Sequence, residues 1–224
     1  AIQNRGGVTG LLIYPRRALE RDQLQSLLQL VDVINEELQA NGKSIITVGI
    51  DDGDTPREGQ VNDGDSFRKL KCVRCGGELI IKRQGALVVC QKCQKEYQYI
   101  MSTKDRIWRE KPTILVTNIW TVYRRLLSRR GISMFYNMDF VVVDEAHVYS
   151  HFLGGHVNHI LRMLRFVSGL HGSVPTFVFS SATIPNPREF ISNLSGVSED
   201  ELFYIDFQET LERARGKKLN RILL

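Results

Sequence analysis

The stretch Phe140-Val141-Val142-Val143-Asp144-Glu145-Ala146-His147 is the part of the sequence that indicates the fold most strongly. Its first four residues are apolar without polar alternation, which is typical of a strand covered on both faces in a parallel sheet. Asp144 and Glu145 would then lie at the carboxyl end of that strand, where α/β sheets bind their ligands. In a nucleotide site the first acid holds Mg²⁺ and the second orients the attacking water. A buried strand that merely ends in two solvated acids is the common alternative.

Short apolar segments alternate with helical patterns on both sides of this stretch. The other predicted strands are residues 11–14, 45–50, 114–116, 177–179 and 202–207. Apolar residues recur every three or four positions in the predicted helices, which are residues 24–38, 118–128, 157–164 and 187–194. This repetition predicts an α/β fold, in which helices flank a parallel sheet and the crossovers are right-handed.

Residues 51–111 interrupt the repetition, because they are polar and contain all four cysteines of the chain. We expect an insertion here rather than another strand–helix unit. The cysteines form two C-x2-C pairs separated by fourteen residues, namely Cys72, Cys75, Cys90 and Cys93. This spacing is typical of a tetrahedral four-sulfur zinc site, whereas two disulfides are disfavoured in an intracellular protein. The segment therefore predicts a zinc ribbon with a hairpin around Gln84-Gly85. Gly76 and Gly77 would allow the tight first turn.

Several segments resemble the motifs of one enzyme family. Asp144-Glu145-Ala146-His147 resembles motif II of the DEAH-type superfamily 2 helicases, and Ser181-Ala182-Thr183 resembles their motif III. Residues 14–23, 53–56 and 116–118 resemble motifs Ia, Ib and Ic. Because the five motifs occur in the family's order, the chain is identified as most of a first RecA-like domain of a DEAD/DEAH-box helicase. Residues 147–157 are similar to the same region of the MrfA-type DNA-repair helicases, although the zinc ribbon departs from that branch.

The resemblance implies a role for each motif. Asp144 would hold Mg²⁺ and Glu145 would position the hydrolytic water, which makes both residues catalytic. His147, Ser181 and Thr183 would complete the ATP site and link the nucleotide state to the domain interface. The remaining motifs would line the nucleic-acid track with the side chains of Arg16, Arg17, Asp54, Thr55, Thr117 and Asn118. Such contacts bind the nucleic-acid backbone and do not depend on its sequence.

No G-x-x-x-x-G-K-S/T motif occurs in the 224 residues. The glycines of residues 5–10 are not followed by the lysine that a P-loop requires. In the family that the chain resembles, the P-loop precedes motif Ia by one helix, so we expect it upstream of Ala1. We also expect the chain alone to lack ATPase activity, and the sheet without its P-loop strand to have exposed apolar edges.

The motifs also suggest a domain organisation. Residues 1–60 and 111–208 would form the partial RecA-like domain, and residues 61–110 the zinc-ribbon insertion. Residues 209–224 would be a linker toward a second RecA-like domain. The histidines at positions 151, 156, 159 and 171 invite a second metal site, but none has a carboxylate partner at ligand spacing, so we assign them to packing and surface.

The composition agrees with this interpretation without proving it. Hydrophobic residues make up 42% and charged residues 25%, which is ordinary for a globular protein, and the formal net charge of +5 suits a polyanionic partner. No apolar run has the length of a membrane span, and no signal peptide is recognisable, so we expect a cytoplasmic or nucleoid-associated protein.

Three functions stay open from the sequence. The first is an ATP-dependent helicase that acts on DNA, of which this chain would be the first motor domain. The second is a non-catalytic nucleic-acid-binding module without a P-loop. The third is a zinc-ribbon protein whose α/β part is a scaffold, since the lysines and arginines around the cysteines either contact a nucleic acid or are simply solvated.

Overall fold

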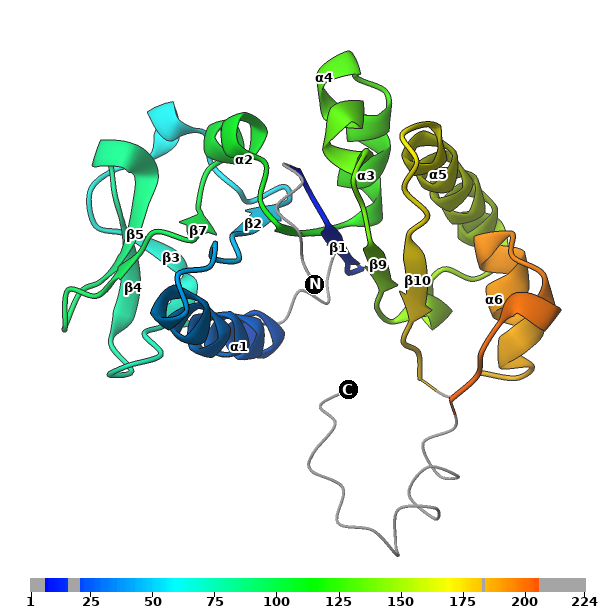
Figure 1. Cartoon of the computed structure of the whole chain (residues 1–224), viewed down its shortest axis with the longest axis horizontal. Helices are drawn as coiled ribbons and strands as arrows, with labels where there is room; N and C mark the ends of the chain where they lie inside the picture. Colours follow the sequence, from blue (N-terminus) through cyan, green and yellow to red (C-terminus); the bar gives the residue numbers. More distant parts are fainter. Residues whose placement is uncertain (1–6, 16–20, 183, 206–224) are drawn as a thin grey trace, which may run out of the picture.

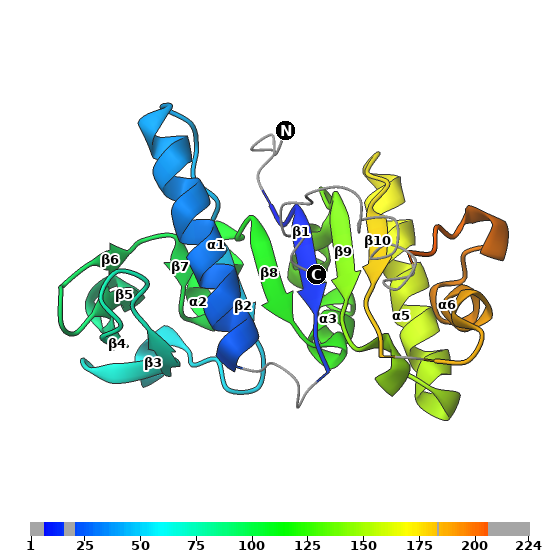
Figure 2. The ribbon, with the colours of Figure 1, turned by 90° about the horizontal axis from the view of Figure 1, so that it is seen from below.

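A six-stranded parallel sheet forms the centre of the molecule. The computed structural model describes residues 7–15, 21–182 and 184–205. The strands follow the order β10-β9-β1-β8-β2-β7 (Figure 2). Their bounds are Gly10–Ile13 for β1, Val48–Asp51 for β2, Ile100–Met101 for β7, Ile114–Thr117 for β8, Phe140–Val143 for β9 and Thr176–Phe179 for β10. All five neighbouring pairs are parallel, so the predicted α/β class is confirmed.

Helices cover the two faces of this sheet unequally (Figure 1). The 20-residue helix α1 (Arg21–Ala40) lies on one face, where Leu24, Leu28 and Val31 are buried against β2 and β8. The other face carries α2 (Lys104–Glu110), α3 (Ile119–Leu126) and α5 (His151–Leu170). The shorter α4 (Arg129–Ile132) follows α3, and α6 (Pro187–Ser195) packs beside α5. In the part of the chain that the structure describes, every helix is too short or too polar to be a membrane span.

The open edge of the sheet lies at β10. The six described strands are consecutively hydrogen-bonded, so no strand is missing between them. Among the described helices only α1 lies on its face of the sheet, and it lies away from β9 and β10. Phe140 of β9 and Val178 of β10 consequently remain 54% and 45% exposed. This exposed apolar surface lies on a face of the sheet at β9 and β10, whereas the sequence predicted exposed apolar edges where a central strand is absent, and the six described strands leave no such gap.

A second, antiparallel sheet forms the ribbon at the β7 end of the molecule. Its strands are β3 (Asp65–Lys71), β4 (Glu78–Lys82), β5 (Leu87–Cys90) and β6 (Glu96–Tyr97). The predicted hairpin joins β4 to β5, and Gly85 occupies the left-handed region there with a φ of 72°. Phe67, Leu79 and Tyr97 belong to the same buried cluster as the apolar side of α1. The ribbon therefore shares its core with the main domain.

Three predicted elements differ from the structure. Residues 51–111 include a strand–helix unit after all, because β7 pairs with β2 and α2 packs on β2. The strand predicted at 45–50 begins at Val48, since both backbone groups of Ile46 bond to the side chain of Asn35 instead of a strand. Residues 202–205 form no strand and Phe203 is exposed, because no neighbouring strand is present among the described residues.

Candidate functional site

Asp144 lies where three parallel strands end side by side. Its backbone N–H donates to Ile13 O at the end of β1, at 2.9 Å. The loop after β9 also contacts the loop after β10, because Ala146 N donates to Ser180 O at 2.8 Å and Ser180 N donates to Val143 O at 3.1 Å. The sequence predicted that residues 144–147 and Ser181-Ala182-Thr183 form one site, and the structure places residues 144–147 beside residues 180–182.

The Asp144 carboxylate accepts hydrogen bonds from three directions. Ser180 Oγ and the N–H of Glu145 donate to Oδ1, the latter at 3.0 Å, and Gln23 Nε2 donates to Oδ2 at 3.2 Å. Gln23 reaches it from the first turn of α1, so a motif Ia side chain and Ser180, the residue before motif III, meet at the Asp144 carboxylate of motif II. The sequence did not single out Ser180 or Gln23 as site residues, because their contact with Asp144 depends on how distant strands are arranged.

Two tyrosines stand close to this carboxylate. Burial, followed by the negative charge of Asp144, raises the pKa of Tyr14 and of Tyr149 above the ordinary tyrosine value. Tyr149 is buried, and its hydroxyl has no hydrogen-bond partner among the residues that the structure describes. Both phenols therefore stay protonated beside the acid.

Glu145 and His147 form the outer part of the site. The backbone of Glu145 is left-handed, with a φ of 50°. Residues other than glycine rarely adopt this conformation, and those that do cluster at functional sites. The Nδ1 atom of His147 lies 3.1 Å from Glu145 Oε2 and 3.4 Å from both Ser181 Oγ and Ala182 N. A protonated Nδ1 donates to Glu145, whereas an unprotonated Nδ1 accepts from Ala182, so the tautomer of His147 selects its partner. Thr183 lies outside the described residues.

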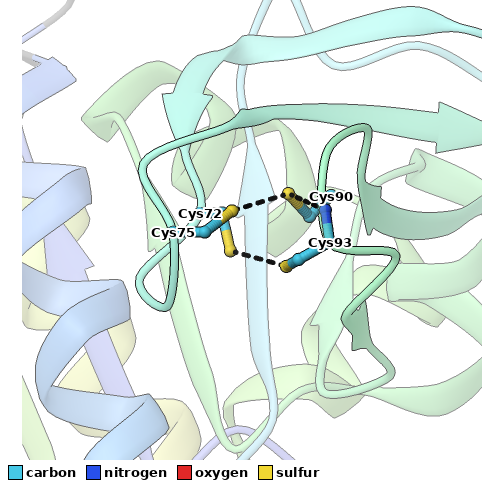
Figure 3. A group of neighbouring side chains, drawn as sticks. All are labelled: Cys72, Cys75, Cys90 and Cys93. Atoms are coloured by element: carbon cyan, nitrogen blue, oxygen red, sulfur yellow. Dashed lines mark hydrogen bonds between the residues drawn. The ribbon is translucent and has the colours of Figure 1, made fainter.

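The four cysteines converge on one point of the ribbon (Figure 3). Their sulfur atoms all lie within 4.8 Å of one another, and the facing pairs Cys72–Cys93 and Cys75–Cys90 are 3.6 and 3.5 Å apart. A disulfide would require about 2.05 Å. A tetrahedral zinc ion with Zn–S bonds of about 2.3 Å would separate its sulfurs by about 3.8 Å. The donor set and its dimensions thus fit a structural zinc ion.

The two turns that carry these cysteines have the same backbone design. Gly76 and Gln94, one residue after each C-x2-C pair, are both left-handed, with φ of 70° and 56°. Gly77 has a different role, since a Cβ there would lie 2.9 Å from Cys90 Sγ and a larger residue would crowd the sulfur atoms.

Burial would raise the pKa of the Cys72 thiol, but the hydrogen bond from the Tyr97 hydroxyl and nearby backbone amides lower this pKa to about 6. The lowered pKa favours the thiolate at Cys72, which is the form that binds metal. At Cys93 the backbone N–H of Lys95 lowers the pKa, but burial and the hydrogen bonds of the other three thiols raise it to about 11.

Comparison with known proteins decides the family. A family model described as DEAD/DEAH box helicase matches residues 78–190, which are 113 of the 224 residues. The chain belongs to the DEAD/DEAH box helicase family. The resemblance predicted from the sequence motifs is therefore confirmed.

Two curated helicases are similar to this DEAD/DEAH box helicase chain over part of its length. The Bacillus subtilis protein named uncharacterized ATP-dependent helicase YprA is 34% identical over 90 residues, covering 39% of this chain and 12% of that protein. The Schizosaccharomyces pombe ATP-dependent helicase hrq1 is 35% identical over 92 residues, covering 40% and 9%. The matched part is about a tenth of the length of these relatives.

Solved helicases share the fold. The Mycobacterium smegmatis helicase Lhr, bound to ssDNA and AMP-PNP, superposes with a TM-score of 0.57 at 20% identity, over 88% of this chain and 20% of that one. The helicase MrfA, bound to DNA, superposes with a TM-score of 0.51 at 22% identity, over 85% of this chain and 20% of that one. The RecA-like architecture inferred from the motifs is confirmed.

The predicted nucleic-acid contacts of this helicase chain are less accessible than the sequence suggested. Thr55 and Thr117 are 4% and 1% exposed, and their hydroxyls donate to the backbone oxygens of Ile50 and Asp51. Asn118 caps α3 by accepting from Thr121 N at 3.0 Å. These three side chains therefore stabilise the backbone at the carboxyl edge of the sheet through internal hydrogen bonds. Of the predicted set, Asp54 is exposed, and Arg16 and Arg17 lie outside the described residues.

A buried ion pair supports the same edge and was missed from the sequence. Asp51, the last residue of β2, accepts from Arg125 Nε at 2.6 Å and also from Nη2, and both side chains are almost completely buried. The guanidinium lies 4.1 Å from the ring centre of Trp108 and bonds to Met134 Sδ. The pair therefore connects β2 with α3, which begins directly after motif Ic.

The histidines of α5 show no second metal site. Among the described residues, the cysteines are the one group of metal-ligating side chains that converge. His156 packs edge-on against Phe152, and His171, just after the helix, stacks on Tyr136 at 3.5 Å between ring centres. These contacts involve two of the four histidines, and the assignment of all four to packing and surface stays a prediction.

Proposed function

We propose that this chain is the first motor domain of an ATP-dependent helicase or translocase that acts on DNA, in repair or processing. The observation that carries the proposal is the meeting of Asp144, Glu145 and His147 with Ser180 and the following residues at the carboxyl edge of the sheet. Two neighbouring acids at such an edge suit a magnesium nucleotide. The curated relatives named as ATP-dependent helicases support the same activity.

The proposed reaction assigns a role to each side chain. Asp144 would hold Mg²⁺ through water, and Glu145 would orient the attacking water and accept its proton. Bound ATP supplies the phosphoanhydride whose hydrolysis drives movement. His147, with Ser181 and Thr183, would transmit the nucleotide state, because the ring can bond either to Glu145 or to the loop after β10.

The phosphate-binding loop is not among these residues. The sequence Gly42-Lys43-Ser44 has the end of a P-loop, but Glu37 stands where the first glycine would be required. It also follows helix α1, whereas a P-loop precedes a helix whose N-terminus binds phosphate. Under the proposal, another part of the intact protein contributes the P-loop, and a second RecA-like domain contributes the arginine finger.

Glu145→Gln in the full-length protein tests this assignment. We expect kcat for nucleic-acid-stimulated ATP hydrolysis to fall by about a hundredfold or more, because the amide cannot accept a proton. KM for ATP should change little. The 224-residue chain alone should show no hydrolysis above background. Glu199→Gln, an exposed acid away from the site, is the control. Robust hydrolysis by the isolated chain, or an unchanged kcat in Glu145→Gln, would contradict the proposal.

The proposed partner is single-stranded DNA. The parallel strands β1, β2 and β8 end at the same edge of the sheet, where backbone amides of the segments that follow them would contact phosphates. The solved relatives that share the fold are described as bound to ssDNA and to DNA, which favours DNA over RNA. A protein with this partner would be cytoplasmic or nucleoid-associated.

The proposal includes the zinc ion and the domain boundaries. Cys72, Cys75, Cys90 and Cys93 would hold a structural zinc ion in the insertion that the sequence places at residues 61–110, between the parts of the RecA-like domain at 1–60 and 111–208. The last part of that insertion, β7 and α2, packs with the main sheet, so the ribbon itself would end before Ile100. Residues 209–224 would link to the second domain. Because no P-loop is present in these residues, a non-catalytic nucleic-acid-binding module is the second candidate. The ATPase measurement on the full-length protein distinguishes the two.

A further inference from the structure

Ribbon strand β3 has an irregular backbone at one position. Arg68 and Lys69 are both left-handed, each with a φ of 54°, a conformation that side chains other than glycine rarely adopt. The pairing with β4 shifts in the same place. Ser66 pairs with Ile80 and Lys71 with Glu78, so five steps along β3 match two steps along β4. A β-bulge of this kind redirects a side chain. Its strained backbone persists only when surrounding contacts stabilise it.

The contact that holds this bulge is made by Arg68. Its Nη1 donates to Asp52 Oδ2 at 2.9 Å and its Nη2 donates to Asp52 Oδ1 at 2.6 Å. Nη2 also lies 3.0 Å from the Thr55 hydroxyl. The guanidinium and the carboxylate are only 20% and 15% exposed, so solvent screens the pair weakly. Burial would raise the pKa of Asp52, but the hydrogen bonds and charge of Arg68 lower it below the ordinary value.

The Asp52 carboxylate in turn organises the loop that follows β2. Asp52 Oδ1 accepts from Asp54 N at 3.0 Å and lies 2.9 Å from Thr55 Oγ1, whose single hydrogen is shared between this oxygen and Ile50 O. Thr55 Oγ1 accepts from Asp52 N at 3.0 Å. This loop includes the motif Ib segment and leaves the sheet at the edge that also carries Asp144 and Thr117. A ribbon side chain thus completes the hydrogen-bond network of a main-domain loop.

The far end of β3 is attached to the main domain independently. Lys71 N donates to Gln25 Oε1 at 2.8 Å, and Gln25 Nε2 donates back to Lys71 O at 2.9 Å. Gln25 lies in the second turn of α1, two residues after Gln23, which contacts Asp144. The strand is therefore fixed at two points, one on the loop after β2 and one on α1.

We infer that β3 of the ribbon braces the proposed nucleic-acid edge, and that Arg68 is the positioning residue that holds the 52–55 loop in its binding conformation. The inference rests on the proposed function, because it takes the motif Ib loop as part of the DNA track. Arg68 acts through Asp52 and need not touch the DNA. The ribbon is then a structural part of the motor domain's binding edge.

The experiment compares four forms of the 224-residue chain loaded with zinc. These are the wild type, Arg68→Ala, Arg68→Lys and the control Arg83→Ala, which removes the same charge from an exposed position at the β4–β5 turn. The first measurement is amide hydrogen exchange at Asp52 and Asp54, whose N–H groups bond within the loop. We expect exchange to accelerate about tenfold or more in Arg68→Ala, since a hydrogen-bonded charge is removed. Arg68→Lys should be intermediate and Arg83→Ala unchanged.

The second measurement is affinity for a fluorescent single-stranded oligonucleotide at fixed salt. We expect Arg68→Ala to bind about tenfold more weakly than Arg83→Ala, because a disordered loop must be ordered again on binding. Zinc content is measured for every variant and should remain equal.

Each outcome has a distinct meaning. Unchanged exchange at Asp52 and Asp54 in Arg68→Ala would overturn the inference, even if the wild type binds DNA. Equal affinity losses in Arg68→Ala and Arg83→Ala would also overturn it, since charge alone would then explain the loss. Loss of zinc in Arg68→Ala would also overturn it, since Arg68 would then be a folding residue of the ribbon and not a positioning residue of the 52–55 loop. A wild-type chain that binds no single-stranded DNA would instead reject the proposed function.

Discussion

Serine in place of Cys72 and Cys90 is expected to abolish zinc binding and to unfold the four-stranded ribbon. Zinc binding to small structural sites contributes about 10–16 kcal/mol, whereas whole domains are stable by only about 5–15 kcal/mol. The ribbon cannot replace that contribution, because its strands are short and its thiols would face one another without a cation. Zinc measured after purification should fall from about one ion per chain to near zero.

The effect should extend into the main domain. Tyr97 donates to Cys72 Sγ, and Tyr99 and Lys95 bond to Asp32 of α1. Hydrogen exchange should therefore accelerate in β3–β6 and also along the buried side of α1, while β9 and α5 remain protected. Gln91→Ala, which changes an exposed residue between the cysteines of the second turn, should keep both zinc and protection. Full protection of α1 in the double serine variant would show that the ribbon is an independent module.

Replacement of Asp51 by alanine is expected to lower the free energy of unfolding by about 3–5 kcal/mol, because it leaves the Arg125 guanidinium buried without a counter-ion. Both side chains are almost inaccessible to water, and the closest remaining partners of Arg125 are an aromatic ring and a thioether. Urea unfolding followed by circular dichroism measures the change. In a domain of this size the melting temperature should fall by about 10 °C.

A double variant separates the charge from the packing. Asp51→Ala combined with Arg125→Met removes both charges and fills the space beside Trp108, so it should recover most of the lost stability. Arg109→Ala removes an exposed guanidinium that pairs with Glu58 and should leave the unfolding midpoint unchanged. A double variant as unstable as Asp51→Ala would show that the pair contributes through something other than compensation of a buried charge.

The cysteine cluster and the Asp51–Arg125 ion pair differ in how far the sequence predicts them. The convergence of the four cysteines was predictable because all four lie within one short segment, and the spacing of a C-x2-C pair determines the local turn. The acids of motif II were predictable for a similar reason, since an apolar run and its end are local features. The Asp51–Arg125 pair joins residues 74 positions apart, and nothing in either local sequence indicates the other partner.

The predicted DNA contacts show a related limit. Thr55, Thr117 and Asn118 were chosen because they follow strands, and the structure does place them at the carboxyl edge of the sheet. Their side chains, however, satisfy backbone and loop hydrogen bonds in the interior. A motif position specifies an end of a strand, whereas burial and partner choice depend on the elements packed around it.

The sequence by itself determined most strands and helices of the main sheet, the acids at the end of β9 and the clustering of the four cysteines, because each depends on residues close together in the chain. Only the tertiary structure decided that Gln23 reaches Asp144 across 121 positions, that Arg68 of the ribbon holds Asp52, and that β7 extends the main sheet. Contacts of this kind form when the parallel sheet brings distant strand ends together, and the spatial order of its strands differs from their order in the chain.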